Sequence, residues 1–129
     1  MSTFLLDTHV LLWAFAEPNR LSPTAADLLV TEANELLVSA ASAWEIATKF
    51  RLGKLPHVGA LLDQWDEALR RLRATPLPID GAHALRAGLY QAGHRDPFDR
   101  VLAAQAELVG CPLLTTDPAF LEFPITTIW

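Results

Sequence analysis

The sequence predicts a three-layer α/β domain in which a central, mainly parallel sheet is covered by helices on both faces. Short, continuously apolar runs at residues 3–6, 36–38 and 112–116 are typical of strands that are buried on both faces. Segments with apolar residues at helical spacing separate these runs, and this alternation of strand and helix is the pattern of a parallel sheet. The length of 129 residues favours one domain over residues 1–129, with roughly two-thirds of the unfolded surface buried.

The first third of the chain alternates strand and helix. The apolar run at residues 3–6 ends at Asp7, and a helix is predicted over residues 10–15. A helix over residues 22–33 has Ser22 as its N-cap and proline in its first position, two residue types that favour a helix start. Residues 36–38 form the second predicted strand.

Two longer helices and an irregular strand are predicted next. The first helix begins at Ser39 and ends near Gly53, because glycine often ends a helix. The second covers residues 61–73 and ends in three arginines, whose charge suits the negative end of the helix dipole. Residues 75–79 contain two prolines, which lack amide donors, so we expect an edge strand or an extended connection there.

The last two predicted helices have aspartates as N-caps. Asp80 is expected to cap a helix that runs to about Gln91, and Asp96 precedes a helix that begins with proline and ends at Gly110. After it, residues 112–116 form the third strand, which ends at Asp117. An extended segment over residues 125–129 closes the chain.

Composition excludes several classes of protein. The apolar runs stay well short of the roughly 18 residues that a membrane-spanning helix needs, and no basic leader precedes Asp7, so we expect a soluble, cytoplasmic protein without a membrane partner. A single cysteine, Cys111, allows no internal disulfide or cysteine-based zinc cluster and is expected to be a small buried side chain. The net charge of −5 argues against nucleic-acid binding by bulk positive potential.

Four acidic residues are predicted to meet at one edge of the sheet. Asp7 and Asp117 end strands, Glu45 lies two turns into a helix that follows a strand, and Asp99 lies in the first turn of another. Function in open α/β sheets gathers at the carboxyl ends of the strands, and like charges remain ionised together only if a cation lies between them. Without these four, eleven acids remain against ten bases, so one anionic pocket could account for most of the imbalance.

Hard divalent cations are the usual partners of oxygen-only sites, so the expected ion is Mg²⁺ or Mn²⁺. Such an ion lowers the pKa of a bound water and neutralises a phosphate, which suits phosphodiester cleavage without a nucleophilic side chain. Helix capping is the competing interpretation. We favour it for Asp80 and Asp96, although Asp96 could also reach a metal, and for Glu45 it requires a helix start at Ser42 rather than at Ser39.

Several other polar residues are weaker candidates. His9 and His94 are expected in loops or behind the metal ligands, and His57 and His83 at the surface. Basic side chains could follow an RNA backbone or could simply be solvated. Several of them lie near the end of one predicted helix. Hydroxyl groups could orient waters or carboxylates, and that of Thr8 could also contact the substrate, although capping is the commoner role. The residues concerned are Lys49, Arg51, Lys54, Arg95 and Arg100 as basic candidates, and Thr8, Ser39, Ser42, Thr115 and Thr116 as hydroxyl candidates.

Over nearly its whole length the chain resembles the PIN domains, and among them the VapC-type ribonuclease toxins of bacterial toxin–antitoxin pairs. The matching segments are FLLDTHVLLW at residues 4–13, SAASAWEI at 39–46 with Lys49 and residues 53–55, HRDPFDR at 94–100 with Ala103 and Ala104, and LTTD at 114–117.

The resemblance implies a parallel-sheet α/β fold and Mg²⁺ or Mn²⁺ bound by Asp7, Glu45, Asp99 and Asp117. It further implies endonucleolytic cleavage of RNA, a homodimer, and inhibition by an antitoxin whose tail enters the acidic groove. The extra acid, Asp96, leaves open which aspartate of the pair is nearer the metal, and we choose Asp99 because Asp96 is expected to cap the helix.

Two other functions remain compatible with the sequence. A Mg²⁺-dependent phosphatase or phosphoryl-transfer switch also has an aspartate after its first strand, but it requires either a second acid at the position of His9 or a late lysine, and no lysine follows Lys54. A non-catalytic module could keep the fold and use its groove to bind a protein partner.

Overall fold

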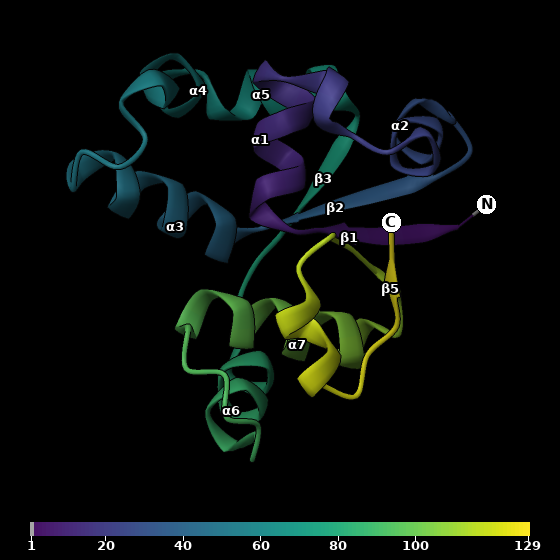
Figure 1. Ribbon diagram of the computed structural model, residues 1–129, viewed down its shortest axis with the longest axis vertical. Helices are drawn as coiled ribbons and strands as arrows, with labels where there is room; N and C mark the ends of the chain where they lie inside the picture. Colours follow the sequence, from purple (N-terminus) through teal and green to yellow (C-terminus); the bar gives the residue numbers. More distant parts are fainter. Residues whose placement is uncertain (1) are drawn as a thin grey trace.

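The computed structural model describes residues 2–129, which form a five-stranded sheet between two layers of helices (Figure 1). The strand order is β3-β2-β1-β4-β5, and every neighbouring pair is parallel, which confirms the predicted sheet. Because β1 is central, the residue that follows it has neighbouring strand ends on both sides. The strands are β1 (Thr3–Leu6), β2 (Glu35–Ser39), β3 (Ala74–Leu77), β4 (Leu113–Leu114) and β5 (Thr127–Ile128).

Alternate residues of β1 point to opposite faces of the sheet and divide the core in two. Phe4 and Leu6 pack in the core on one face, whereas Leu5 packs with Leu102 of α7 in the core on the other. Helices cover both faces of the sheet, and Figure 1 shows a first group of them above the sheet and a second group below it. The first group is α1 (Thr8–Ala16), α2 (Pro23–Val30), α4 (Gly59–Asp63) and α5 (Trp65–Leu72), and the second is α6 (Gly81–Leu89) and α7 (Pro97–Val109).

Helix α3 (Ala40–Arg51) follows the end of β2 and contributes to both cores. Its Ala41 is buried with the α7 side of the sheet and its Ile46 with the α1 side. Ser39 caps this helix, since its Oγ accepts a hydrogen bond from the Ala41 amide at 2.9 Å. The predicted start at Ser39 is therefore confirmed, and Glu45 is not needed for a capping box.

The structure corrects the predicted bounds of three elements. The helix expected over residues 61–73 is divided at Gln64 into α4 and α5, because α4 packs on α3 while α5 packs on β3. The helix expected to reach residue 33 ends at Val30, and the strand expected over residues 112–116 is regular only at Leu113–Leu114. Within residues 2–129 there are also three short 3₁₀ helices, at Pro18–Arg20, Pro56–Val58 and Pro118–Glu122.

Other expectations from the sequence are confirmed. Residues Ala74–Leu77 form β3 at the edge of the sheet, where prolines are tolerated, and Cys111 is buried. Asp80 and Asp96 both cap their helices. Within residues 2–129, none of the helices combines the length and the apolar character needed to cross a bilayer.

Candidate functional site

The candidate site lies where the carboxyl end of β1 meets α3 and the start of α7. Asp7 directly follows β1 and is 3% exposed, and Glu45 of α3 is equally buried. The rings of Trp44 and Phe98 meet edge to face with centroids 4.8 Å apart, and each ring immediately precedes an acidic residue of its segment. This contact holds the acid-bearing turn of α3 against the first turn of α7.

The charges of three other acids act on Asp99 at this place. Burial is the main cause that raises the pKa of Asp99 to about 6; a hydrogen bond from His94 opposes it, and the charges of Asp96, Asp7 and Glu45 raise it further. Carboxylates whose charges raise the pKa of the same neighbour share one electrostatic environment. The structure thus brings together four of the five acids that the sequence selected, namely Asp7, Glu45, Asp96 and Asp99.

Asp7 is held by a residue that is distant in the sequence. Thr115 Oγ1, just after β4, donates a hydrogen bond of 2.7 Å to Asp7 Oδ2. Burial nevertheless raises the pKa of Asp7 above its ordinary value, because the Thr115 hydrogen bond and the charge of His9 only partly offset it and the charge of Glu45 adds to it. Although Asp7 occupies the N-cap position of α1, its side chain makes no capping hydrogen bond with the described residues. The Asp7 carboxylate is therefore not used to cap the helix and can interact with another group.

The two oxygens of Glu45 have different surroundings. Oε2 accepts a hydrogen bond from Lys49 Nζ at 2.6 Å. Oε1 is buried and has no hydrogen-bond partner within residues 2–129. A buried carboxylate oxygen without a partner is costly, so this atom indicates a place for a ligand.

Asp96 and Asp99 divide two tasks at the start of α7. Asp96 Oδ1 accepts from the amides of Phe98 and Asp99 at 2.9 and 3.1 Å, which confirms that it is the N-cap. Asp99 Oδ2 lies 2.8 Å from His94 Nε2, and this histidine therefore lies behind a candidate ligand as expected. The hydrogen bond with Asp99 is the main cause that raises the pKa of His94, so donation from Nε2 is favoured.

Asp117 is turned toward its own segment. Its Oδ1 accepts from the Ala119 amide at 2.9 Å and caps the 3₁₀ helix that follows. Its backbone amide donates to Thr115 Oγ1 at 3.0 Å, so the Thr115 hydroxyl joins Asp117 to Asp7. Among residues 2–129 no three side chains of histidine, cysteine, aspartate or glutamate form a ready-made metal cage. The role of Asp117 as a metal ligand, like the roles of the other acids, remains a prediction.

The structure gives several of the weaker candidates other contacts. Thr8 Oγ1 is buried and lies 2.9 Å from the Ser42 hydroxyl. The guanidinium of Arg100 donates to four backbone carbonyls, which is a structural role. Arg51, Lys54 and Arg95 are exposed, as an RNA contact requires.

One expectation about the histidines is wrong. His83 is buried rather than at the surface, because its Nδ1 accepts a hydrogen bond from the Asp80 amide in a capping box and lies 3.3 Å from Gln105 Nε2. His57 is exposed, as expected.

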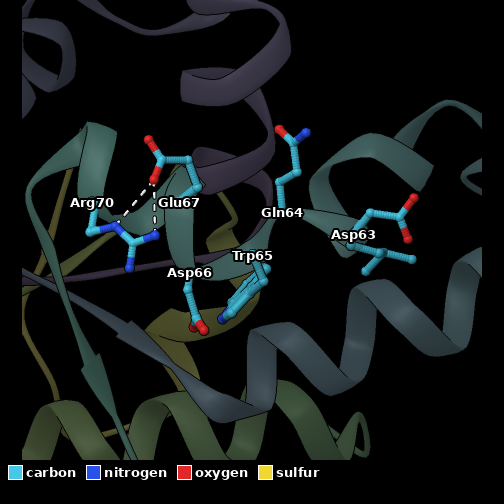
Figure 2. Close-up of a pocket in the computed structure, with 7 residues that line it drawn as sticks. Asp63, Gln64, Trp65, Asp66, Glu67 and Arg70 are labelled. Atoms are coloured by element: carbon cyan, nitrogen blue, oxygen red, sulfur yellow. Dashed lines mark hydrogen bonds and ion pairs between the residues drawn. The ribbon is translucent and has the colours of Figure 1, made fainter.

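One hollow in the described chain lies away from this site. It measures about 410 Å³ and surrounds the junction of α4 and α5. Figure 2 shows that the guanidinium of Arg70 is already paired with Glu67 in this hollow, at 2.9 Å. None of the site residues selected from the sequence lines it, so it is not the candidate site. The lining residues are Leu62, Asp63, Gln64, Trp65, Asp66, Glu67 and Arg70.

Thr115 is the residue that sequence reasoning underrated, because its partner lies 108 positions away. We expect Thr115→Val, which keeps the shape and removes the hydroxyl, to lower the free energy of unfolding by about 1–3 kcal/mol by leaving buried polar groups unpaired. Urea titration measures this loss. Thr116→Val at the exposed neighbour is the control, and equal stability of the two variants would contradict a role for the hydroxyl.

The raised pKa of Asp99 predicts that the free energy of unfolding depends on pH. Because the folded pKa of about 6 exceeds the ordinary 3.8, folding favours protonated Asp99, and stability falls as the pH rises through that window. A difference of this size corresponds to at most about 3 kcal/mol, because solvent reaches part of this carboxyl and screens its charge. Metal-free Asp99→Asn should therefore be more stable than the original chain at pH 8, with little difference near pH 3.5.

Thermal unfolding in chelator across this pH range measures the effect, and Asp63→Asn at an exposed position is the control. If the advantage of Asp99→Asn were the same at both ends of the range, the titration of Asp99 would not be its source.

Comparison with known proteins gives one consistent match. The PIN domain family model matches residues 4–125. Ribonuclease VapC22 of Mycobacterium tuberculosis (strain ATCC 25618 / H37Rv) is 38% identical over 120 residues, which cover 91% of this chain and 88% of that protein. Ribonuclease VapC16 of the same strain is 48% identical over 50 residues, which cover 39% of this chain and 36% of that protein.

Solved structures agree in fold. VapBC2 from Rickettsia felis, bound to a DNA fragment from its promoter, has a TM-score of 0.70 at 15% identity, with 98% of this chain and 97% of that chain covered. FitAcB from Neisseria gonorrhoeae has a TM-score of 0.59 at 24% identity, with coverage of 98% and 96%. At identities of 15% and 24%, this likeness shows the fold alone.

Proposed function

Because this chain belongs to the PIN domain family, we propose that it is a metal-dependent endoribonuclease and the toxin of a toxin–antitoxin pair. The observation that supports the proposal is that contacts between α1, α3 and the start of α7 bring the turns that carry Asp7, Glu45 and Asp99 together. The names of the two ribonuclease relatives support RNA as the substrate. We propose Mg²⁺ or Mn²⁺ as the cofactor.

The chemistry of the site fits a hard divalent cation. All the candidate ligands are carboxylate oxygens, which Mg²⁺ and Mn²⁺ prefer. Two of the acids, Asp7 and Asp99, have raised pKa values with burial as the main cause, and a nearby cation would relieve their charge. Glu45 Oε1 supplies a buried acceptor for which the described residues provide no donor. We propose Asp7, Glu45, Asp99 and Asp117 as ligands, with Asp96 as an additional candidate.

The side chains around the site hold and orient these ligands. When bound, the cation would lower the pKa of a water and neutralise charge on the phosphate. Thr115 fixes one oxygen of Asp7, and His94 fixes one oxygen of Asp99, so neither of these two hydrogen bonds occupies the second oxygen of the carboxylate. Hydrogen bonds of this kind orient metal ligands and tune their basicity. The exposed side chains of Arg51, Lys54 and Arg95 are proposed to follow the RNA backbone.

RNA cleavage by the purified chain is the direct test. We expect structured RNA to be cut internally in Mn²⁺ or Mg²⁺, to survive in EDTA, and to be cut again after the metal is restored. Cleavage that persists in EDTA would contradict the metal centre. RNA that stays intact in both ions would contradict the enzyme and favour a non-catalytic binding module.

We also propose a cognate antitoxin and a homodimer as the protein's partners. The VapBC toxin–antitoxin complexes among the structural neighbours support this assignment. The test is coexpression with the product of the adjacent reading frame: a stable complex that suppresses RNA cleavage supports the pair. Scattering measurements of the free chain that give a monomer mass would contradict the dimer.

A further inference from the structure

Lys49 lies one helical turn beyond Glu45 on α3 and forms the shortest ion pair near the candidate site. Its Nζ is 2.6 Å from Glu45 Oε2, and the lysine side chain is 31% exposed whereas that of glutamate is 3% exposed. Residues four apart lie on one helix face, so the pair follows from the sequence spacing. An RNA contact, the role expected from sequence, would require this ammonium to leave Glu45.

The ammonium of Lys49 shares the environment of the other acids. Burial lowers its pKa, but the hydrogen bond and charge of Glu45, followed by the charges of Asp96 and Asp99, raise it above the ordinary value overall. A fixed positive charge therefore already lies among carboxylates that are proposed to hold a cation. Glu45 is the point where the two would meet, since its Oε1 is unpaired in the described chain.

We propose that Lys49 is a positioning residue that acts as a built-in counter-ion, so that its ammonium and a divalent cation compete for the Glu45 carboxylate. This inference rests on the proposed metal-dependent function. In the metal-free protein the ammonium offsets the charge of buried Glu45, which otherwise has no cation beside it in the described chain. When a metal occupies the crevice, the two positive charges repel each other, and the coupling between them is unfavourable.

The proposal makes an unusual prediction about metal affinity. A lysine that merely supports the ligand would lower Mn²⁺ affinity when removed, as the loss of an outer partner usually does. A competing lysine would raise it. We expect Lys49→Met to bind Mn²⁺ roughly tenfold or more tightly than the original chain, a typical size for coupling between two sites. Lys49→Arg keeps the charge and should bind Mn²⁺ with nearly the original affinity.

Calorimetric titration with Mn²⁺ alone measures these affinities without RNA or turnover. Arg71→Met removes one positive charge from an exposed position on α5 and controls for net charge. Thermal unfolding gives a second readout, because Lys49→Met should unfold at a lower temperature than the original chain in EDTA, and saturating Mn²⁺ should narrow the gap. Lys49→Gln provides a second uncharged variant should methionine prevent folding.

A double-mutant cycle locates the effect on Glu45. In a Glu45→Gln background, Lys49→Met should raise Mn²⁺ affinity much less, since the shared carboxylate is gone and only the repulsion between the ammonium and the metal remains. Affinity that is unchanged or weaker in Lys49→Met would overturn the counter-ion proposal while leaving Mn²⁺-dependent cleavage, and thus the proposed function, intact. Failure of the original chain to bind Mn²⁺ would overturn both the metal centre and the inference.

Discussion

Asp7→Asn is expected to lower the rate of metal-dependent RNA cleavage by more than the roughly 100-fold that loss of an outer partner can cause. Asp7 is the acid at the centre of the site, because it follows the middle strand β1 and its charge acts on Asp99. An amide has nearly the same shape but carries no charge to hold a cation. Initial rates at saturating Mn²⁺ measure the loss.

The same substitution should not harm the fold. Burial raises the pKa of Asp7, so the ionised carboxylate weakens the metal-free protein, and a neutral side chain removes that cost. We therefore expect Asp7→Asn to unfold in EDTA at a temperature equal to or above that of the original chain near pH 8. Loss of activity together with retained stability would separate a functional role from a structural one.

A matched control comes from an acid that the site does not use. Asp66→Asn is exposed at the start of α5 and should change neither the cleavage rate nor the stability appreciably. If Asp7→Asn cleaved RNA as fast as this control, the assigned centre would be wrong. If it unfolded like a core variant, the buried carboxylate would have a structural role instead.

The sequence contained enough information to predict the sheet and the helix starts. Apolar runs such as residues 3–6 need burial on both faces, and caps such as Ser39 and Asp96 act within a few residues, so both are local signals. The break at Gln64 was not predictable in this way, since it depends on packing against two different elements.

The candidate site was predictable only in part, for the same reason. The four acids could be proposed to meet because parallel strands end at the same edge, and the Glu45–Lys49 pair is visible in its spacing of four. The contact between Thr115 and Asp7 joins segments that are distant in the chain, and no local pattern reports it. Arg100 shows the opposite error: a basic residue beside the acids looks like an RNA contact, yet the fold uses it internally.

Arg100→Met should therefore cause the largest loss of stability among the variants considered. Its Nε donates to the Ala87 carbonyl in α6, and both Nη atoms donate to carbonyls of the segment that joins α6 to α7, at distances of 2.6 to 3.1 Å. Hydrogen bonds to charged groups contribute about 1.5–3 kcal/mol each, and the carbonyls can regain water on loss, so we expect a total near 4 kcal/mol in urea titration. Arg95→Met, an exposed neighbour, is the control and should lose little. Hydrogen exchange should speed up at residues 90–96, and because this segment carries His94 and Asp96, cleavage should fall as well. Unchanged stability with weakened RNA binding would instead support the substrate contact that the sequence suggested.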